Sequence, residues 1–260
     1  MLFFMNWQKK LLELEKELCK LTQDGSFLFY LPRSTPTSVI VTSSHGISQN
    51  EIVREINVAQ LTLDVAVESN SVGIIGTYSK DYKNLDEIDE NNLCGYHYAI
   101  EKSIEVLKSY YDEIAIISLH GFDEKKERPR IKVKRKGKEY LTNLKGKDVD
   151  IGIGNYPPRV SPPKKEYLRK IWFKDVTMKP TYAEKVAEEF RKNGLVAEVG
   201  QYFRSEFTFN VIRSKGDPAK GIHACNIEYS KECRTEKYIL TKKATVKVVK
   251  LLHRLLTKQI

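Results

Sequence analysis

The stretch Glu113–Leu119 (EIAIISL), which runs into His120-Gly121, decides the fold. It is an apolar run, as expected for a strand buried on both faces of a largely parallel sheet. On both sides of this stretch along the sequence, short apolar runs alternate with amphipathic helical patterns. The predicted strands are 39–42, 71–77, 113–119, 148–153, 195–199 and 222–229, and the predicted helices are 6–22, 51–67, 97–111, 182–193 and 241–257. This alternation predicts one α/β domain over residues 1–260, with three α/β/α layers and a mostly parallel, mixed sheet.

Composition excludes several classes of protein. The 260 residues are 41% hydrophobic and 30% charged, which excludes disordered and low-complexity chains. No apolar run is long enough to span a membrane, and the N-terminus does not resemble a signal peptide, so we expect a cytoplasmic protein without a membrane partner. Four cysteines without a CxxC pair argue against a zinc ribbon, although Cys225 and Cys233 could pair. Abundant Lys, Glu, Ile and Tyr with few Gln are typical of thermophilic, archaeal-like proteins.

Positive charge is concentrated in one segment. The chain has a net charge of +10, and residues 125–147 hold eleven Lys or Arg against two Glu. Within it, alternation over Arg130–Arg135, a turn at Gly137 and a return over Lys138–Leu141 predict a basic β-hairpin insertion at about 128–143. Such a hairpin is either a solvated edge or a surface for nucleic acid or an anionic substrate. Its one aromatic residue, Tyr140, is too little for a stacking platform.

Chemistry-bearing residues follow the predicted strands. His45-Gly46 comes after strand 39–42 and His120-Gly121 after strand 113–119, while Glu51 begins a helix and Glu228 lies near the end of strand 222–229. Ligands of such sheets bind beyond the carboxyl ends of the strands. Two His and one carboxylate are a common catalytic zinc set with a position left for water, and a further carboxylate can serve as general base. The same His residues could instead only cap turns in ordinary loops.

Other enzyme motifs are missing. Gly152-Ile153-Gly154 lacks the third glycine and the following helix of a dinucleotide fingerprint. Neither a phosphate-binding GxxxxGK[ST] loop nor a GxSxG nucleophile elbow occurs, which argues against an NTPase and a serine hydrolase.

Several short motifs between about residues 39 and 234 occur in an order that is similar to that of a known protein family. The most specific is Gly221–Glu228 (GIHACNIE), preceded by Gly216-Asp217-Pro218. The shorter ones are Ser44-His45-Gly46, Asn50–Glu55, Tyr96-His97, Leu119-His120-Gly121 and Asp148–Gly152. Together they resemble the N-formylglutamate amidohydrolase family, which is similar to zinc carboxypeptidases, aspartoacylases and poly-γ-glutamate hydrolases.

The resemblance implies a phosphorylase/hydrolase-like α/β fold and a zinc-dependent amidohydrolase that cleaves the C–N bond of an acyl-amino-acid-like or small peptide substrate. It implies one Zn²⁺ held by His45, Glu51 and His120, with Glu55 one helical turn away as the alternative carboxylate. Glu228 would be the general acid/base. Arginines would stabilise the oxyanion or hold a substrate carboxylate, with Arg213 and Arg204 as the catalytic candidates. The expected substrate-binding residues are His97, Lys80, Asp150, Arg130 and Asn226.

The chain departs from the family where the family binds a substrate carboxylate. Two arginines of the family are replaced by Lys80 and Glu87. A lysine lacks the planar fork of arginine, so formylglutamate itself is doubtful and a small anionic amide remains the expected substrate. The alternatives are a carboxypeptidase or deacylase acting on a modified peptide or a nucleic-acid-linked substrate, and a non-catalytic nucleic-acid-binding protein that uses the hairpin. The sequence does not indicate an oligomeric state.

Overall fold

The computed structural model describes residues 2–45, 57–78, 84–88, 93–122, 130–206 and 210–258. In these ranges, seven strands form one sheet in the order β1-β3-β2-β4-β9-β7-β8, and two further strands, β5 and β6, form a separate hairpin. The strands are β1 (Phe27–Tyr30), β2 (Val39–Ser43), β3 (Val72–Gly76), β4 (Ile114–Gly121), β5 (Lys132–Arg135), β6 (Lys138–Leu141), β7 (Val149–Gly152), β8 (Ala197–Val199) and β9 (Ile222–Tyr229).

The sheet is mixed. Strands β3, β2, β4 and β9 are parallel neighbours, β1 is antiparallel to β3, and β7 is antiparallel to β9 and parallel to β8. The ends of β2, β4 and β9 therefore share one edge with the beginning of β7, which we call the carboxyl edge. At this edge Tyr229 pairs with Gly121 on one side and with Val149 on the other.

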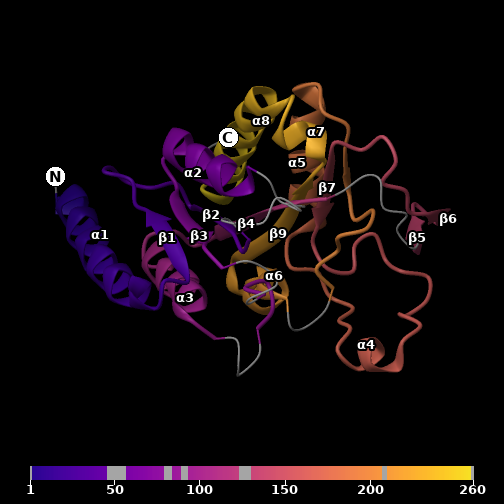
Figure 1. The fold of residues 1–260 in the computed structure, drawn as a ribbon, viewed down its shortest axis with the longest axis horizontal. Coiled ribbons are helices and arrows are strands. Elements are labelled where there is room, and N and C mark those ends of the chain that lie inside the picture. Colours follow the sequence, from indigo (N-terminus) through magenta and orange to yellow (C-terminus); the bar gives the residue numbers. More distant parts are fainter. Residues whose placement is uncertain are drawn as a thin grey trace.

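Helices cover both faces of the sheet, as Figure 1 shows. One layer holds α2, α5, α7 and α8, and the other holds α1, α3 and α6. The helices are α1 (Leu2–Leu21), α2 (Val58–Ser69), α3 (Gly95–Lys108), α4 (Glu166–Lys170), α5 (Pro180–Lys192), α6 (Val211–Lys215), α7 (Lys231–Arg234) and α8 (Tyr238–Leu256), with 3-10 turns at Thr22–Asp24 and Pro218–Lys220. The predicted α/β class with helices on both faces is confirmed.

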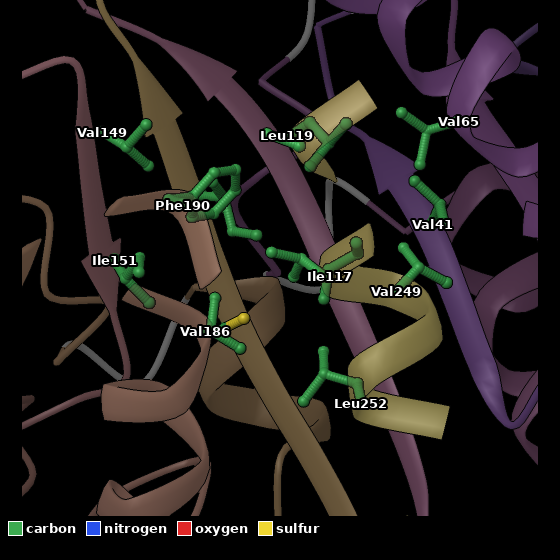
Figure 2. Packing of buried hydrophobic residues seen from close by; sticks show 14 of the residues in the cluster. Val41, Val65, Ile117, Leu119, Val149, Ile151, Val186, Phe190, Val249 and Leu252 are labelled. Carbon is green, nitrogen blue, oxygen red and sulfur yellow. The ribbon is translucent and has the colours of Figure 1, made fainter. Parts of the chain in front are cut away.

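Alternation along the central strands sorts their side chains by face. Ile117 and Leu119 of β4 pack against α5 and α8, where Figure 2 shows them beside Phe190 and Leu252. Residues at the alternate positions of β4 point to the opposite face of the sheet. Ile114 and Ile116 therefore join the cluster formed with α1 and α3.

The same alternation continues to the carboxyl edge on the α3 face. Because side chains two residues apart share a face, Ser118 and His120 follow Ile116 on that side of β4. In β9, Asn226 lies opposite Ser118 and Glu228 lies opposite His120. The α3 face is therefore apolar in its first half and polar where the strands end.

Several boundaries differ from the sequence prediction. Strand β4 extends to Gly121, so His120 belongs to the strand and not to the loop after it. The edge strand β1 and the short helix α6 were not predicted. Helix α6 has only five residues, too few for a helical period, and begins because the side chain of Asn210 accepts hydrogen bonds from two backbone N–H groups. Most of the segment predicted as a helix before Val58 lies outside the described residues.

Two other expectations concern membranes and cysteines. No helix among the described residues combines the length and apolarity needed to cross a bilayer. Cys225 and Cys233 are free thiols and do not pair. Burial raises the pKa of Cys225 to about 12 and that of Cys233 to about 11, so both thiols stay protonated and act as core side chains.

Candidate active site

Two imidazoles meet at the carboxyl edge. His45 follows β2 by two residues, His120 lies in β4, and these strands are parallel neighbours. Their ring centroids are 6.0 Å apart with the planes at 69°, and both side chains are buried. With Zn–N bonds of about 2.0–2.1 Å, two rings that share an ion have centroids roughly 5–6 Å apart. The pair is thus spaced within reach of one divalent ion.

Ser118 and Asp86 position the imidazole of His120. Ser118 Oγ lies 2.8 Å from Nε2 of His120, and Asp86 Oδ1 lies 3.8 Å from the same nitrogen. Asp86 is held in turn by the side-chain amide of Asn210, which donates to Oδ2 at 2.9 Å. Histidines that bind metals typically engage their second ring nitrogen with a carboxylate, a carbonyl or water. Sequence reasoning did not single out Asp86 or Ser118. The only signal for Asp86 was an acidic residue in a polar loop after a strand.

Glu228 occupies the centre of the polar face. It lies opposite His120 in the β4–β9 ladder and opposite Asp150 in the β9–β7 ladder, and it is 5% exposed. Asn226, two residues earlier on the same face, is also buried. The structure therefore brings Glu228, Asn226 and the two imidazole-bearing strands to one edge of the sheet.

Buried polar atoms without hydrogen-bond partners gather in this region. Within the described ranges they include Ser43 Oγ, Ser44 Oγ, Asp86 Oδ1 and Asn226 Oδ1. Most buried polar atoms in proteins are satisfied, because an unpaired one costs free energy. Four such atoms near one strand edge indicate a site built to receive a polar ligand.

The donor set fits a metal ion in part. His45 and His120 converge, but the described residues contain no group of three or more His, Cys, Asp or Glu suited to hold an ion. Glu51 and Glu55, the carboxylates expected to complete the set, lie outside the described residues. Lys80 also lies outside them.

His97 contacts the backbone next to Asp86. It is buried in α3, with Nδ1 3.4 Å from Sγ of Cys94 and Nε2 3.1 Å from the carbonyl oxygen of Leu85. A carbonyl only accepts, so Nε2 is the donor in this contact. His97 therefore fixes the residue that precedes Asp86, which makes it a positioning residue.

Asp150 holds residues 201–203 where they pass close to β7, beside Glu228. Its carboxylate accepts the backbone N–H groups of Gln201, Tyr202 and Phe203 at 2.8–2.9 Å. Burial raises the pKa of Asp150, and these three donors oppose that shift. A Cβ at Gly152 would lie 1.7 Å from the carbonyl oxygen of Phe203, so the crossing requires glycine there. Asp150 therefore has a structural role, as the acceptor that holds residues 201–203 in place.

The predicted arginines are held by other partners. Arg204 is buried, with Nε 3.1 Å from Glu206 and further donations to Asn155 Oδ1 and to the carbonyl oxygens of Gly200 and Pro157. Arg213 lies over the ring of Phe173 at 4.3 Å and 3.8 Å from Asp175. Arg130 is exposed at the start of the hairpin. The hydrogen bonds of Arg204 go to groups other than Glu228 and His120, while its positive charge helps to lower the pKa of Asp150.

Solved structures share this arrangement of strands and helices. N-formylglutamate amidohydrolase from Ralstonia eutropha JMP134 aligns with a TM-score of 0.61 and 13% identity, covering 90% of this chain and 99% of that one. This chain therefore shares the α/β fold of that protein. The gene product Atu2144 from Agrobacterium tumefaciens aligns with a TM-score of 0.53, 9% identity and coverage of 90% and 94%. Zinc-free YndL aligns with a TM-score of 0.43, 10% identity and coverage of 90% and 95%.

Sequence comparison finds no counterpart: no family model and no curated protein matches the chain. At identities this low, the likeness to solved structures establishes the fold and leaves the chemistry to the site. That site combines two converging imidazoles, a buried carboxylate on the neighbouring strand and several unsatisfied polar atoms.

Proposed function

We propose that the protein is a zinc-dependent amidohydrolase that cleaves the C–N bond of a small anionic acyl-amino-acid-like or peptide substrate. The observation that carries this proposal is the convergence of His45 and His120 beside Glu228 at one strand edge. The likeness of the fold to that of N-formylglutamate amidohydrolase from Ralstonia eutropha supports it at the level of architecture.

His45 and His120 would hold the ion, with Glu51 or Glu55 as the carboxylate ligand. Bound zinc polarises the amide carbonyl and lowers the pKa of a water molecule. Ser118 and Asp86 fix the plane of the His120 ring through Nε2, so Nδ1 would be its ligating atom.

Glu228 would move the proton. A carboxylate next to the reacting centre can take a proton from the attacking water and deliver it to the leaving nitrogen. Its position opposite His120 on the neighbouring strand supports this role. Asn226 Oδ1, a buried acceptor without a partner in the described ranges, is suited to hold the N–H of the scissile amide.

The test is an amide screen with N-acyl amino acids and short peptides. Protein loaded with Zn²⁺, protein treated with a chelator and the Glu228→Gln variant are assayed in parallel for release of the free amine. We expect turnover only with metal-loaded wild-type protein. Equal turnover by chelated protein, or none by protein whose zinc content has been verified, would contradict the proposal.

A further inference from the structure

The positive charge of the molecule lies on two segments that the fold joins. We call residues 130–147 and 158–174 together the basic lobe. They contain fourteen Lys or Arg and two Glu, a net charge of +12, whereas the whole chain carries +10. The rest of the chain therefore has a slight net negative charge, and long-range attraction of an anionic partner would come from the basic lobe.

Backbone hydrogen bonds unite the two segments. The N–H of Lys134 donates to the carbonyl of Pro158 at 2.8 Å, and the N–H of Val160 donates to the carbonyl of Lys132 at 2.9 Å. Residues 158–160 thus lie along β5 as a short third strand. Figure 1 shows β5, β6 and α4 at the end of the molecule opposite α1.

One face of the hairpin is anchored and the other is exposed. Val133 is buried, and Arg135 on the same face donates to the carbonyl of Val199. Lys132 and Lys134 alternate with these residues and are exposed, as is Lys136 in the turn. The anchored face holds the hairpin on the body, and on the exposed face Lys132 pairs with Glu139 at 3.1 Å across the hairpin while Lys134 and Lys136 face solvent.

Exposed tyrosines accompany the charge. Tyr140 of β6 and Tyr167 of α4 are 50% and 59% exposed. The sequence assigns only Tyr140 to the hairpin, and the fold adds the second ring from the 158–174 segment. Positive charge combined with exposed aromatic rings is the pattern used by proteins that bind single strands, because bases stack on the rings while cations neutralise phosphates.

From these observations we propose that the basic lobe binds single-stranded nucleic acid. The proposal does not depend on amide hydrolysis, because it rests on the charge, backbone pairing and exposed rings of the lobe. Each phosphate neutralised by a lysine lowers the logarithmic salt slope of the binding constant by about 0.7 for single strands.

The experiment measures fluorescence anisotropy of labelled oligouridylate and oligothymidylate of about 16 nucleotides, long enough for a site of this kind. The hairpin variant Lys132→Glu, Lys134→Glu, Lys136→Glu should bind at least about tenfold more weakly, with the salt slope reduced by about two. Tyr140→Ala with Tyr167→Ala should weaken binding by about tenfold without changing the slope. A second charge variant, Lys164→Glu, Lys165→Glu, Lys174→Glu, tests the other segment if the hairpin variant does not fold.

The matched control is Lys243→Glu, Lys247→Glu, Lys250→Glu on α8, which makes the same charge change at exposed positions outside the lobe. We expect the control and Glu228→Gln to bind like wild type. Equal losses in the control and hairpin variants would overturn the proposal. So would an absence of oligonucleotide binding at low salt, or equally tight binding of poly-L-glutamate, which would indicate an unspecific polyanion surface or an acidic-protein site.

Discussion

Glu228 lies opposite His120 in the parallel ladder of β4 and β9, and on its other side it lies opposite Asp150 in the antiparallel ladder of β9 and β7. The three side chains form a row across three strands on the α3 face. Ser118 and Asp86 contact His120, and three backbone N–H groups hold Asp150. Glu228 is therefore buried between two side chains that are each held by further hydrogen bonds or ion pairs.

Replacing Glu228 by Gln keeps the shape of the side chain and removes its ability to take up a proton. We expect kcat for the amide substrate to fall by about 10²–10⁴-fold, the usual contribution of a general base. Zinc content and thermal stability should match those of wild type. Turnover within a few-fold of wild type in a zinc-loaded variant would show that Glu228 is not the base.

Removing one imidazole should remove the metal. We expect His45→Ala to lose stoichiometric zinc after dialysis, because a binding set reduced by one ligand no longer competes with the buffer. Elemental analysis of the dialysed protein measures this. His253→Asn is the matched control, since His253 lies in α8 and bonds to Ser38. Zinc retained by His45→Ala at the wild-type level would contradict the assignment.

Asp86→Asn tests how His120 is oriented. The substitution keeps the size of the side chain but removes its charge 3.8 Å from Nε2. Loss of a partner behind a metal-binding histidine typically weakens metal affinity by about 10–100-fold. Competition with a chromogenic chelator gives the affinity. An unchanged zinc affinity would show that Asp86 does not act on the metal through His120.

Asp150→Ala should destabilise the fold rather than change the chemistry alone. The variant leaves three buried N–H groups without their acceptor, and we expect a loss of about 2–5 kcal/mol in the free energy of unfolding. Urea denaturation measures the loss. Asp175→Ala is the control, because its side chain is 79% exposed and its ion pair with Arg213 is long, at 3.8 Å. Wild-type stability of Asp150→Ala would rule out the anchoring role.

Acid should weaken the packing of α8 against β2. Nδ1 of His253 accepts the backbone N–H of Ser38 at 3.1 Å, and burial lowers the pKa of His253, whose ring also contacts Tyr111. A protonated Nδ1 cannot accept. Because the folded-state pKa lies below the unfolded value of about 6.5, this stability is present above pH 6.5 and is lost as the pH falls below it.

His253→Asn keeps an acceptor that does not titrate. Urea denaturation at several pH values between 7.5 and 5 should therefore show a smaller loss of stability in the variant than in wild type. A remaining slope is expected from His223, whose pKa is also lowered by burial. Identical pH profiles for the variant and wild type would show that His253 does not titrate with folding.

The places of candidate residues in the fold were predictable where strand position alone determines them. His45, His120 and Glu228 were expected near strand ends, and the structure places them together at one edge. Arg204 and Asp150 show the opposite case. The sequence around a charged residue does not show whether groups elsewhere in the chain already form hydrogen bonds with it. Here the side-chain oxygen of Asn155 accepts a hydrogen bond from Arg204, and the backbone N–H groups of residues 201–203 donate to Asp150.

The sequence by itself determined the apolar strands, the amphipathic helices and the α/β class, because the periods of side-chain burial are local properties of a few residues. Only the tertiary structure decided that β7 runs antiparallel to β9, that Asp86 reaches His120, and that residues 158–160 pair with β5. These relationships join residues about 25 to 80 positions apart. They depend on which strands pair and on how the connecting loops close. Neither property produces a periodic pattern in the sequence.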